Sequence, residues 1–166
     1  GGREFEILTA GIGPVAQDQL ADALLRVLED EVTYRPSAVP GSGPFPTSHG
    51  AWLNTPQDDA QRHAAASLYA AMMTATCLDL VGNSGDIIIE GPFSTNITYA
   101  GALAAITGAQ VLVTDQNSPS GTAIGAALLA TRVAPNQRYQ SVARLAGLRG
   151  YYEKWVSLLQ ANQINA

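Results

Sequence analysis

The residues with the clearest potential for chemistry follow a short apolar run near the middle of this chain. Three consecutive isoleucines at 87–89 lead into the tetrapeptide EGPF at 90–93. Gly91 permits a sharp bend, and Pro92 cannot continue a strand ladder. Asn96 is a typical N-cap, so we expect a helix to begin beside the bend. The unpaired N–H groups of such a helix start can bind polar atoms of a ligand, which makes this bend a candidate binding site.

The elements that must position this bend follow one another as strand, helix, strand and helix. The isoleucine run predicts a strand that is buried on both faces. Tyr99, Leu103 and Ile106 then recur at helical spacing, residues 111–113 predict a second strand, and a helix of small residues follows from about Ser120. Such a unit predicts two parallel strands with a right-handed crossover. Ligands of such sheets bind at the carboxyl ends of the strands, where the bend lies.

This stretch, at 86–130, resembles a segment of the FGGY carbohydrate kinases of the sugar kinase, Hsp70 and actin superfamily. It shares their apolar strand, glycine turn, helix ending in Thr-Gly, short strand and Gly-Ala-Ala helix, here GTAIGAALLA at 121–130. GGREFEIL at 1–8 is similar to another segment of the same lobe. The resemblance implies an α/β fold: a truncated ribonuclease-H-like (actin-like ATPase) lobe, rich in helices, with a small sheet that contains a parallel βαβα unit.

The resemblance also implies that the glycine turn is an adenosine motif and that the Gly-Ala-Ala helix packs behind it. It assigns nucleotide binding to Gly91, Pro92, Phe93 and Asn96. Several family members carry a run of glycines where this chain has Pro92 and Phe93. Pro92 has no N–H to offer a ligand, whereas Phe93 could offer a ring face to adenine. The alternatives are a tight turn that binds nothing for Gly91, core packing for Phe93 and helix capping for Asn96.

The function that the resemblance implies is that of the C-terminal lobe of a kinase that uses ATP, with Mg²⁺ in the intact enzyme, to phosphorylate a sugar or polyol hydroxyl. In that family the catalytic aspartate and most sugar-binding residues lie upstream of the part that this chain matches. We therefore assign no catalytic or metal-binding residue here, and we expect the isolated chain to bind ATP or ADP weakly without phosphorylating a sugar. The alternatives are a non-catalytic nucleotide-binding module and a helical interaction module.

The composition fits one domain spanning residues 1–166, which we expect to be a fragment of a larger kinase. Hydrophobic residues make up 46% of the chain and charged residues 14%, which argues against disorder. The net charge is −5, and the nine Lys and Arg residues are scattered, so no basic footprint for nucleic acid is present. No apolar run approaches the ~20 residues of a membrane span, and no signal peptide is visible, so we expect a cytoplasmic protein. An exposed sheet edge, which can pair with another copy of the chain, predicts a homo-oligomer.

The rest of the chain predicts helices over 15–31, 55–81 and 138–160. The stretch at 33–55 is rich in proline and glycine and predicts a long loop, docked on the body by Phe45 and Trp52. Residues 1–9 fit either a strand or the tail of a loop.

Details of these elements lead to further expectations. Thr55 is expected to cap the helix over 55–81, with Asp58 completing a capping box. His63 is expected to face solvent, and Cys77 to be a small buried hydrophobe. His49 has no orienting partner in the sequence, and the aromatic residues at 151–155 fit a core better than a stacking surface.

Overall fold

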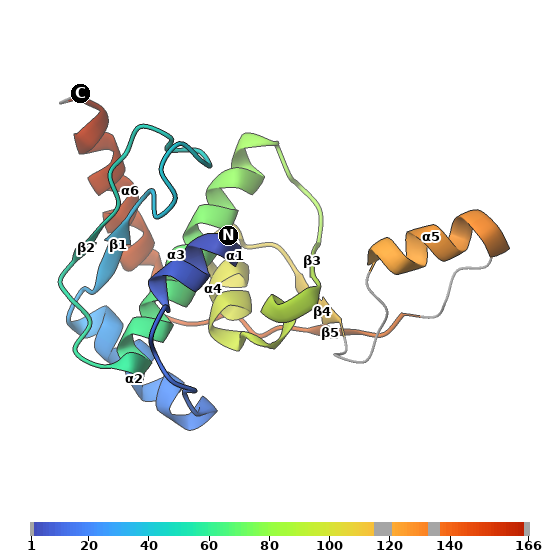
Figure 1. Ribbon diagram of the computed structural model, residues 1–166, viewed down its shortest axis with the longest axis horizontal. Helices are drawn as coiled ribbons and strands as arrows, with labels where there is room; N and C mark the ends of the chain where they lie inside the picture. Colours follow the sequence, from blue (N-terminus) through green and yellow to red (C-terminus); the bar gives the residue numbers. More distant parts are fainter. Residues whose placement is uncertain (1, 115–120, 133–136, 165–166) are drawn as a thin grey trace.

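The chain folds around one long helix, as the computed structural model shows for residues 2–114, 121–132 and 137–164 (Figure 1). In chain order the elements are α1 (Gly2–Leu8), α2 (Gln17–Glu29), β1 (Thr33–Arg35), β2 (Ala51–Leu53), α3 (Asp59–Leu80), β3 (Ile87–Ile89), the 3-10 helix η1 (Gly91–Thr95), α4 (Ile97–Thr107), β4 (Val111–Thr114), α5 (Gly121–Thr131), β5 (Tyr139–Ser141) and α6 (Leu148–Ile164). Helices hold far more of these residues than strands do, as predicted. The fold is therefore a helix-rich α/β arrangement with small sheets.

The predicted strand–helix–strand unit is present. Ile87, Ile88 and Ile89 of β3 pair in parallel with Val111, Leu112 and Val113 of β4. The antiparallel strand β5, which was not predicted, pairs with the other edge of β4. The carboxyl end of β3 leads directly into η1 and α4, so the sheet places the predicted bend beside a helix start.

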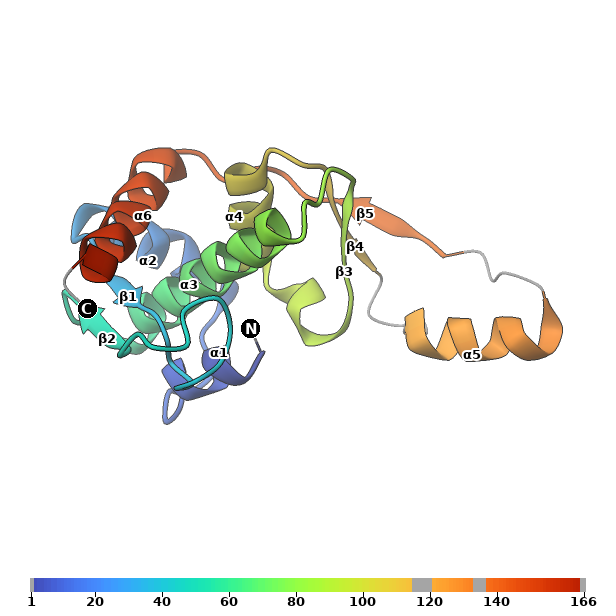
Figure 2. The ribbon, with the colours of Figure 1, turned by 90° about the horizontal axis from the view of Figure 1, so that it is seen from above.

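The prediction that the isoleucine strand is buried on both faces is wrong. Ile87 and Ile89 are buried, but the side chain of Ile88 is 49% exposed. The Gly-Ala-Ala helix was expected to pack behind the bend, yet α5 stands away from the body (Figure 2) and has no buried residue. Within the described residues, the sheet face that carries Ile88 therefore lacks the helix cover that parallel strands usually have.

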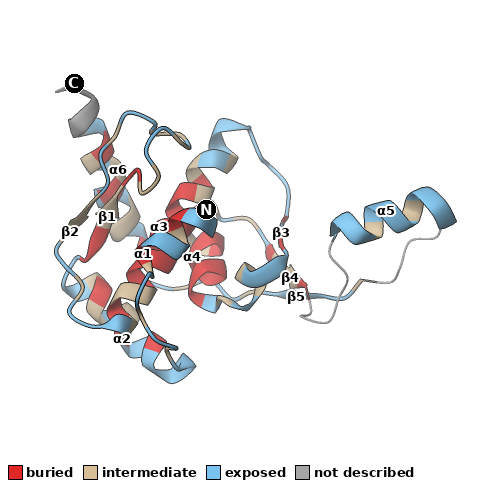
Figure 3. Cartoon of the chain, viewed as in Figure 1, coloured by how far each residue is buried: buried red, intermediate tan, exposed pale blue. Residues whose placement is uncertain are grey.

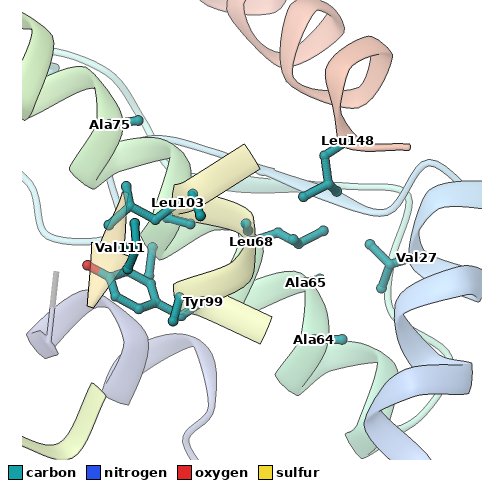
Figure 4. Close-up of a cluster of buried hydrophobic side chains, with 14 of the residues drawn as sticks. Val27, Ala64, Ala65, Leu68, Ala75, Tyr99, Leu103, Val111 and Leu148 are labelled. Carbon is teal, nitrogen blue, oxygen red and sulfur yellow. The ribbon is translucent and has the colours of Figure 1, made fainter. Parts of the chain in front are cut away.

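The main core surrounds α3, whose alanines allow neighbouring helices to approach closely (Figure 3). Side chains from α2, α3, α4, β4 and α6 meet there, among them those of Val27, Ala64, Ala65, Leu68, Ala75, Tyr99, Leu103, Val111 and Leu148 (Figure 4). Complete burial of a leucine side chain contributes roughly 1.5 to 3 kcal/mol. This core fixes α4 against α3, and with it the bend that precedes α4.

A second core forms where α6 crosses the other side of α3. Trp155 is 1% exposed and its indole N–H donates to the Tyr34 carbonyl at 3.0 Å. The prediction that the aromatics at 151–155 belong to a core is thus confirmed. The last helix was expected from about Arg138 but begins at Leu148, because residues 139–141 pair as β5 instead.

The first residues form helix α1, so neither a strand nor a loop tail is correct for them. Tertiary contacts hold this short helix: the buried Glu4 carboxylate accepts from the Tyr69 hydroxyl at 2.7 Å and from the Ala38 N–H at 3.2 Å. Phe5 and Leu8 pack against the two cores. The position of α1 is therefore set by residues far along the chain.

The stretch at 33–55 is a loop only between two paired ends. Its first and last residues form the antiparallel strands β1 and β2, which corrects the prediction of an irregular loop throughout. The two predicted anchors are confirmed: the ring centroid of Phe45 lies 6.1 Å from that of Trp155, and Trp52 packs against both hydrophobic cores.

Helix ends agree with the predictions near the bend and differ elsewhere. Asn96 caps α4 as predicted, since its side-chain oxygen accepts from the Tyr99 N–H at 2.9 Å. The cap of α3 is Asp58 rather than Thr55, because the Asp58 carboxylate accepts from the Gln61 N–H at 2.8 Å. Cys77 is exposed rather than buried, because the last turns of α3 extend past their packing partners.

Candidate functional site

The predicted bend lies open at the surface. Gly91 has a φ of +72°, a left-handed conformation that favours glycine, and nothing lies within 4 Å of where its Cβ would be. Pro92 occupies the first turn of η1, where its missing N–H costs no hydrogen bond. A ligand can therefore approach the backbone at the carboxyl end of β3.

A cavity of about 300 Å³ lies beside the bend, and we call it the η1 cavity. It brings together η1 and the start of α4 with α1, α3 and the start of α2. Its lining residues are Phe5, Val15, Gln17, Leu20, His63, Pro92, Phe93, Thr95, Asn96 and Ile97. Pro92, Phe93 and Asn96 of the predicted set thus share one cavity, and Gly91 forms the bend next to it.

Phe93 belongs to an aromatic cluster that joins η1 to α1. Its ring centroid lies 5.3 Å from that of Phe5 and 4.6 Å from that of Tyr99. Burial raises the pKa of the Tyr99 phenol, so the side chain at the base of the cluster stays neutral. Phe93 is half-buried, so its ring is fixed by packing and also lines the cavity.

Asn96 uses both polar atoms of its side chain. Its oxygen caps α4, and its Nδ2 donates to the Ser67 hydroxyl of α3 at 2.9 Å. Thr95 is also engaged, because its hydroxyl donates to the Pro92 carbonyl at 3.0 Å. These bonds hold η1 and the start of α4 in one orientation against α3.

His63 is half-buried in this cavity, so the expectation that it faces solvent is wrong. Its ring stands edge-on to Phe5, with centroids 5.3 Å apart, and its Nδ1 is buried without a hydrogen-bond partner among the described residues. Burial lowers the pKa of the imidazole, so the ring is neutral near pH 7. Nothing local in the sequence indicated this, because the residue that covers His63, Phe5, lies in α1.

Glu90 was not predicted as a site residue, yet it connects the bend to α5. Its carboxylate accepts from the Gly121 N–H at 2.8 Å, at the start of that helix. A Cβ on Gly121 would lie 2.8 Å from the same carboxylate oxygen, so a side chain there would push the Glu90 carboxylate away from this contact. A carboxylate is favoured at a helix start, where the helix dipole is positive.

The described ranges hold neither a metal-ligand cluster nor a membrane-spanning helix. No group of three or more His, Cys, Asp or Glu side chains in them is arranged to hold a metal ion. None of the helices in these ranges is both long and apolar enough to cross a bilayer. His49 lies exposed in the loop between β1 and β2, and its backbone carbonyl accepts from Arg35 at 3.0 Å.

The helix-rich α/β fold with its small, partly parallel sheet is that of an actin-like ATPase lobe. A family profile described as "Carbohydrate kinase FGGY, C-terminal domain" matches residues 1–140. The chain belongs to this family.

Solved structures agree with this assignment. A carbohydrate kinase from Novosphingobium aromaticivorans is similar with a TM-score of 0.86 and 30% identity, over 98% of this chain and 36% of that one. A xylulose kinase from Rhodospirillum rubrum shares the fold with a TM-score of 0.64 at 14% identity, over 99% of this chain and 37% of that one. The chain thus spans little more than a third of either structure. No curated protein sequence matches it significantly.

Proposed function

We propose that this domain supplies the adenosine-binding side of a kinase that transfers the γ-phosphoryl group of ATP to a sugar or polyol hydroxyl. The observation that carries the proposal is the open Gly91 bend, which follows a parallel strand and adjoins a cavity of about 300 Å³. Ligands of α/β sheets bind at such strand ends, and small-molecule sites combine apolar walls with a few polar groups. The η1 cavity has both properties.

Each predicted residue has a distinct role in this proposal. Gly91 lets the nucleotide approach the backbone, since no side chain covers the bend. Pro92 and Phe93 supply an apolar wall for the adenine ring. Asn96 acts as a positioning residue, because both of its polar atoms hold the start of α4 in place. The N–H groups at helix starts beside the bend suit the polar atoms of ribose and phosphate.

The phosphoryl transfer itself needs groups that we assign to other parts of the kinase. A catalytic base, further phosphate donors and a carboxylate for Mg²⁺ are required, and the described residues show no metal-binding cluster. Mg²⁺ usually binds through substrate phosphates and one or two carboxylates, so it would enter with ATP. We expect the sugar to bind mainly outside this domain, and the isolated chain to be inactive.

The kinase proposal is tested with the full gene product. ADP release is measured with ATP, Mg²⁺ and a panel of sugars and polyols. Saturable, sugar-dependent ADP release that disappears without Mg²⁺ supports the proposal. ADP release that no sugar or polyol stimulates would contradict it, and ATP binding without turnover would favour a non-catalytic nucleotide-binding module.

A second role as an interaction module is favoured by α5. Its residues are largely apolar, none of them is buried, and Leu129 is 88% exposed. The outer edge of β3 is also unpaired within the described sheet, so we propose that two copies of the chain associate through this region. Light scattering of wild type and Leu129→Glu tests this: a dimer that the substitution converts to monomer supports association, and a monomeric wild type opposes it.

We propose that the protein acts in the cytoplasm, where ATP is available, and that it does not bind nucleic acid. The net charge of −5 and the scattered basic residues support the second point.

A further inference from the structure

The η1 cavity contains few polar side chains that could select a nucleobase. Its walls are mostly apolar, and the exceptions are Gln17, His63, Thr95 and Asn96. Apolar walls bind any base, because every base has a flat apolar face. Strong selection between ligands requires a group that hydrogen-bonds one of them and is left unpaired by the other. The base-selecting residue should therefore be one of these four.

Three of the four are engaged or covered. Asn96 uses its oxygen to cap α4 and its nitrogen to bond Ser67. The Thr95 hydroxyl donates its proton to the Pro92 carbonyl. His63 has its Nδ1 buried and its ring fixed edge-on to Phe5, so it contributes chiefly a wall.

Gln17 differs from these three. It is the first residue of α2, it is exposed, and its side-chain amide makes no hydrogen bond within the described parts of the chain. The helix start does not need it, because Gln19 accepts from the Ala16 N–H at 3.2 Å. Leu20, one turn further along α2, is buried and lines the same cavity. Residues three apart share a helix face, which places Gln17 over the cavity.

The amide of a glutamine matches one edge of adenine. Its carbonyl accepts from the N6 amino group while its NH₂ donates to N7, a bidentate pair. Guanine presents two acceptors, O6 and N7, on the same edge, so the carbonyl of the amide finds no donor there. Arginine pairs with those two guanine acceptors instead.

We propose that Gln17 is the residue that selects adenine in the η1 cavity. This inference rests on the proposed nucleotide-binding function. Gln17 does not take part in phosphoryl transfer; it fixes the base edge while Phe93 and Pro92 hold its face. Loss of one bidentate pair predicts about a tenfold loss of the preference for ATP over GTP.

The test measures the affinities of ATP and GTP by displacement of a fluorescent nucleotide from the full gene product. Wild type is compared with Gln17→Ala and Gln17→Arg, and His63→Phe tests the neighbouring polar group. Gln140→Ala, an exposed residue of β5, is the matched control. Thermal melting of each variant confirms that it is folded.

We expect the ratio of ATP affinity to GTP affinity to fall about tenfold in Gln17→Ala. In Gln17→Arg, this ratio should shift in favour of GTP. His63→Phe and Gln140→Ala should keep the wild-type ratio. This inference would be overturned by an unchanged affinity ratio in Gln17→Ala, or by a loss of ATP preference in His63→Phe alone. Either result would leave the proposed nucleotide-binding function standing. If wild type binds neither nucleotide, the proposed function fails together with it.

Discussion

The carboxylate of Glu90 accepts a hydrogen bond of 2.8 Å from the N–H of Gly121. This contact joins the end of β3 to the start of α5, a helix that has no buried residue. Among the described residues, this carboxylate contact links the bend to α5, and a side chain at Gly121 would displace it.

Replacement of Gly121 by alanine should detach α5 from the bend. The added Cβ would lie 2.8 Å from Glu90 Oε2, so the Glu90 carboxylate would have to turn away and give up its hydrogen bond to the Gly121 N–H. We expect faster amide hydrogen exchange over 121–131, measured by mass spectrometry. Gly125→Ala is the matched control, because nothing lies within 4 Å of its Cβ position and alanine favours a helix interior by about 0.5 to 1 kcal/mol. Slower exchange in both variants would contradict the role of the Glu90 contact.

Replacement of Leu68 by alanine should strongly destabilise the domain. Leu68 of α3 is fully buried against the neighbouring elements, so its truncation leaves a cavity that costs about 2 to 5 kcal/mol. Leu129→Ala, in the exposed helix α5, should change the free energy of unfolding by less than about 0.5 kcal/mol. Urea unfolding followed by circular dichroism measures both. Similar costs for the two variants would show that α5 packs against the body.

His63 should make the domain less stable in mild acid. Burial lowers the pKa of its imidazole below the ordinary value of about 6.5, so the folded protein resists a proton that the unfolded chain binds. The contribution of His63 to the free energy of unfolding is fully present above about pH 6.5. It falls as the pH drops from there towards the lower pKa that the imidazole has in the folded protein. Melting temperatures measured between pH 7.5 and 5.5 should thus fall more steeply in wild type than in His63→Phe.

A control for that experiment is the other histidine. His49→Gln, at an exposed loop position, should keep the wild-type pH dependence. If His49→Gln flattens the profile and His63→Phe does not, the buried imidazole is not the cause.

Local signals in the sequence were sufficient to predict the centre of the fold. The isoleucine run, the glycine bend and the Asn96 cap act within a few residues of one another, and the structure shows the strand, bend and helix that they predict. The family resemblance added what local signals cannot, namely the type of lobe. Neither source indicated β5, because its three residues are all exposed and only pairing with β4 makes them a strand.

The surroundings of the bend depend on contacts between distant segments, which explains what the sequence did not predict. Glu4 becomes buried through a hydrogen bond to Tyr69, and this docks a short helix that local propensity does not require. Phe5 then covers His63, so a histidine that follows a polar helix start becomes part of a cavity wall. The cavity itself unites four separate stretches of chain, and no single stretch carries its pattern.

We propose above all that the Gly91 bend holds the adenosine part of ATP. Valine at Gly91 would have to adopt a φ near +72° or distort the bend, and its side chain would occupy the open approach. Gly41→Val is the matched control, since Gly41 has a φ of +75° and equally open surroundings in the loop between β1 and β2. Both variants carry the same conformational cost, and only one changes the proposed site.

The decisive measurement is a calorimetric titration of ATP into wild type, Gly91→Val and Gly41→Val, each shown to be folded by thermal melting. We predict saturable binding to wild type and to Gly41→Val, and an affinity at least about tenfold lower for Gly91→Val, a loss of 1.4 kcal/mol or more. Equal ATP affinity in wild type and Gly91→Val would contradict the account.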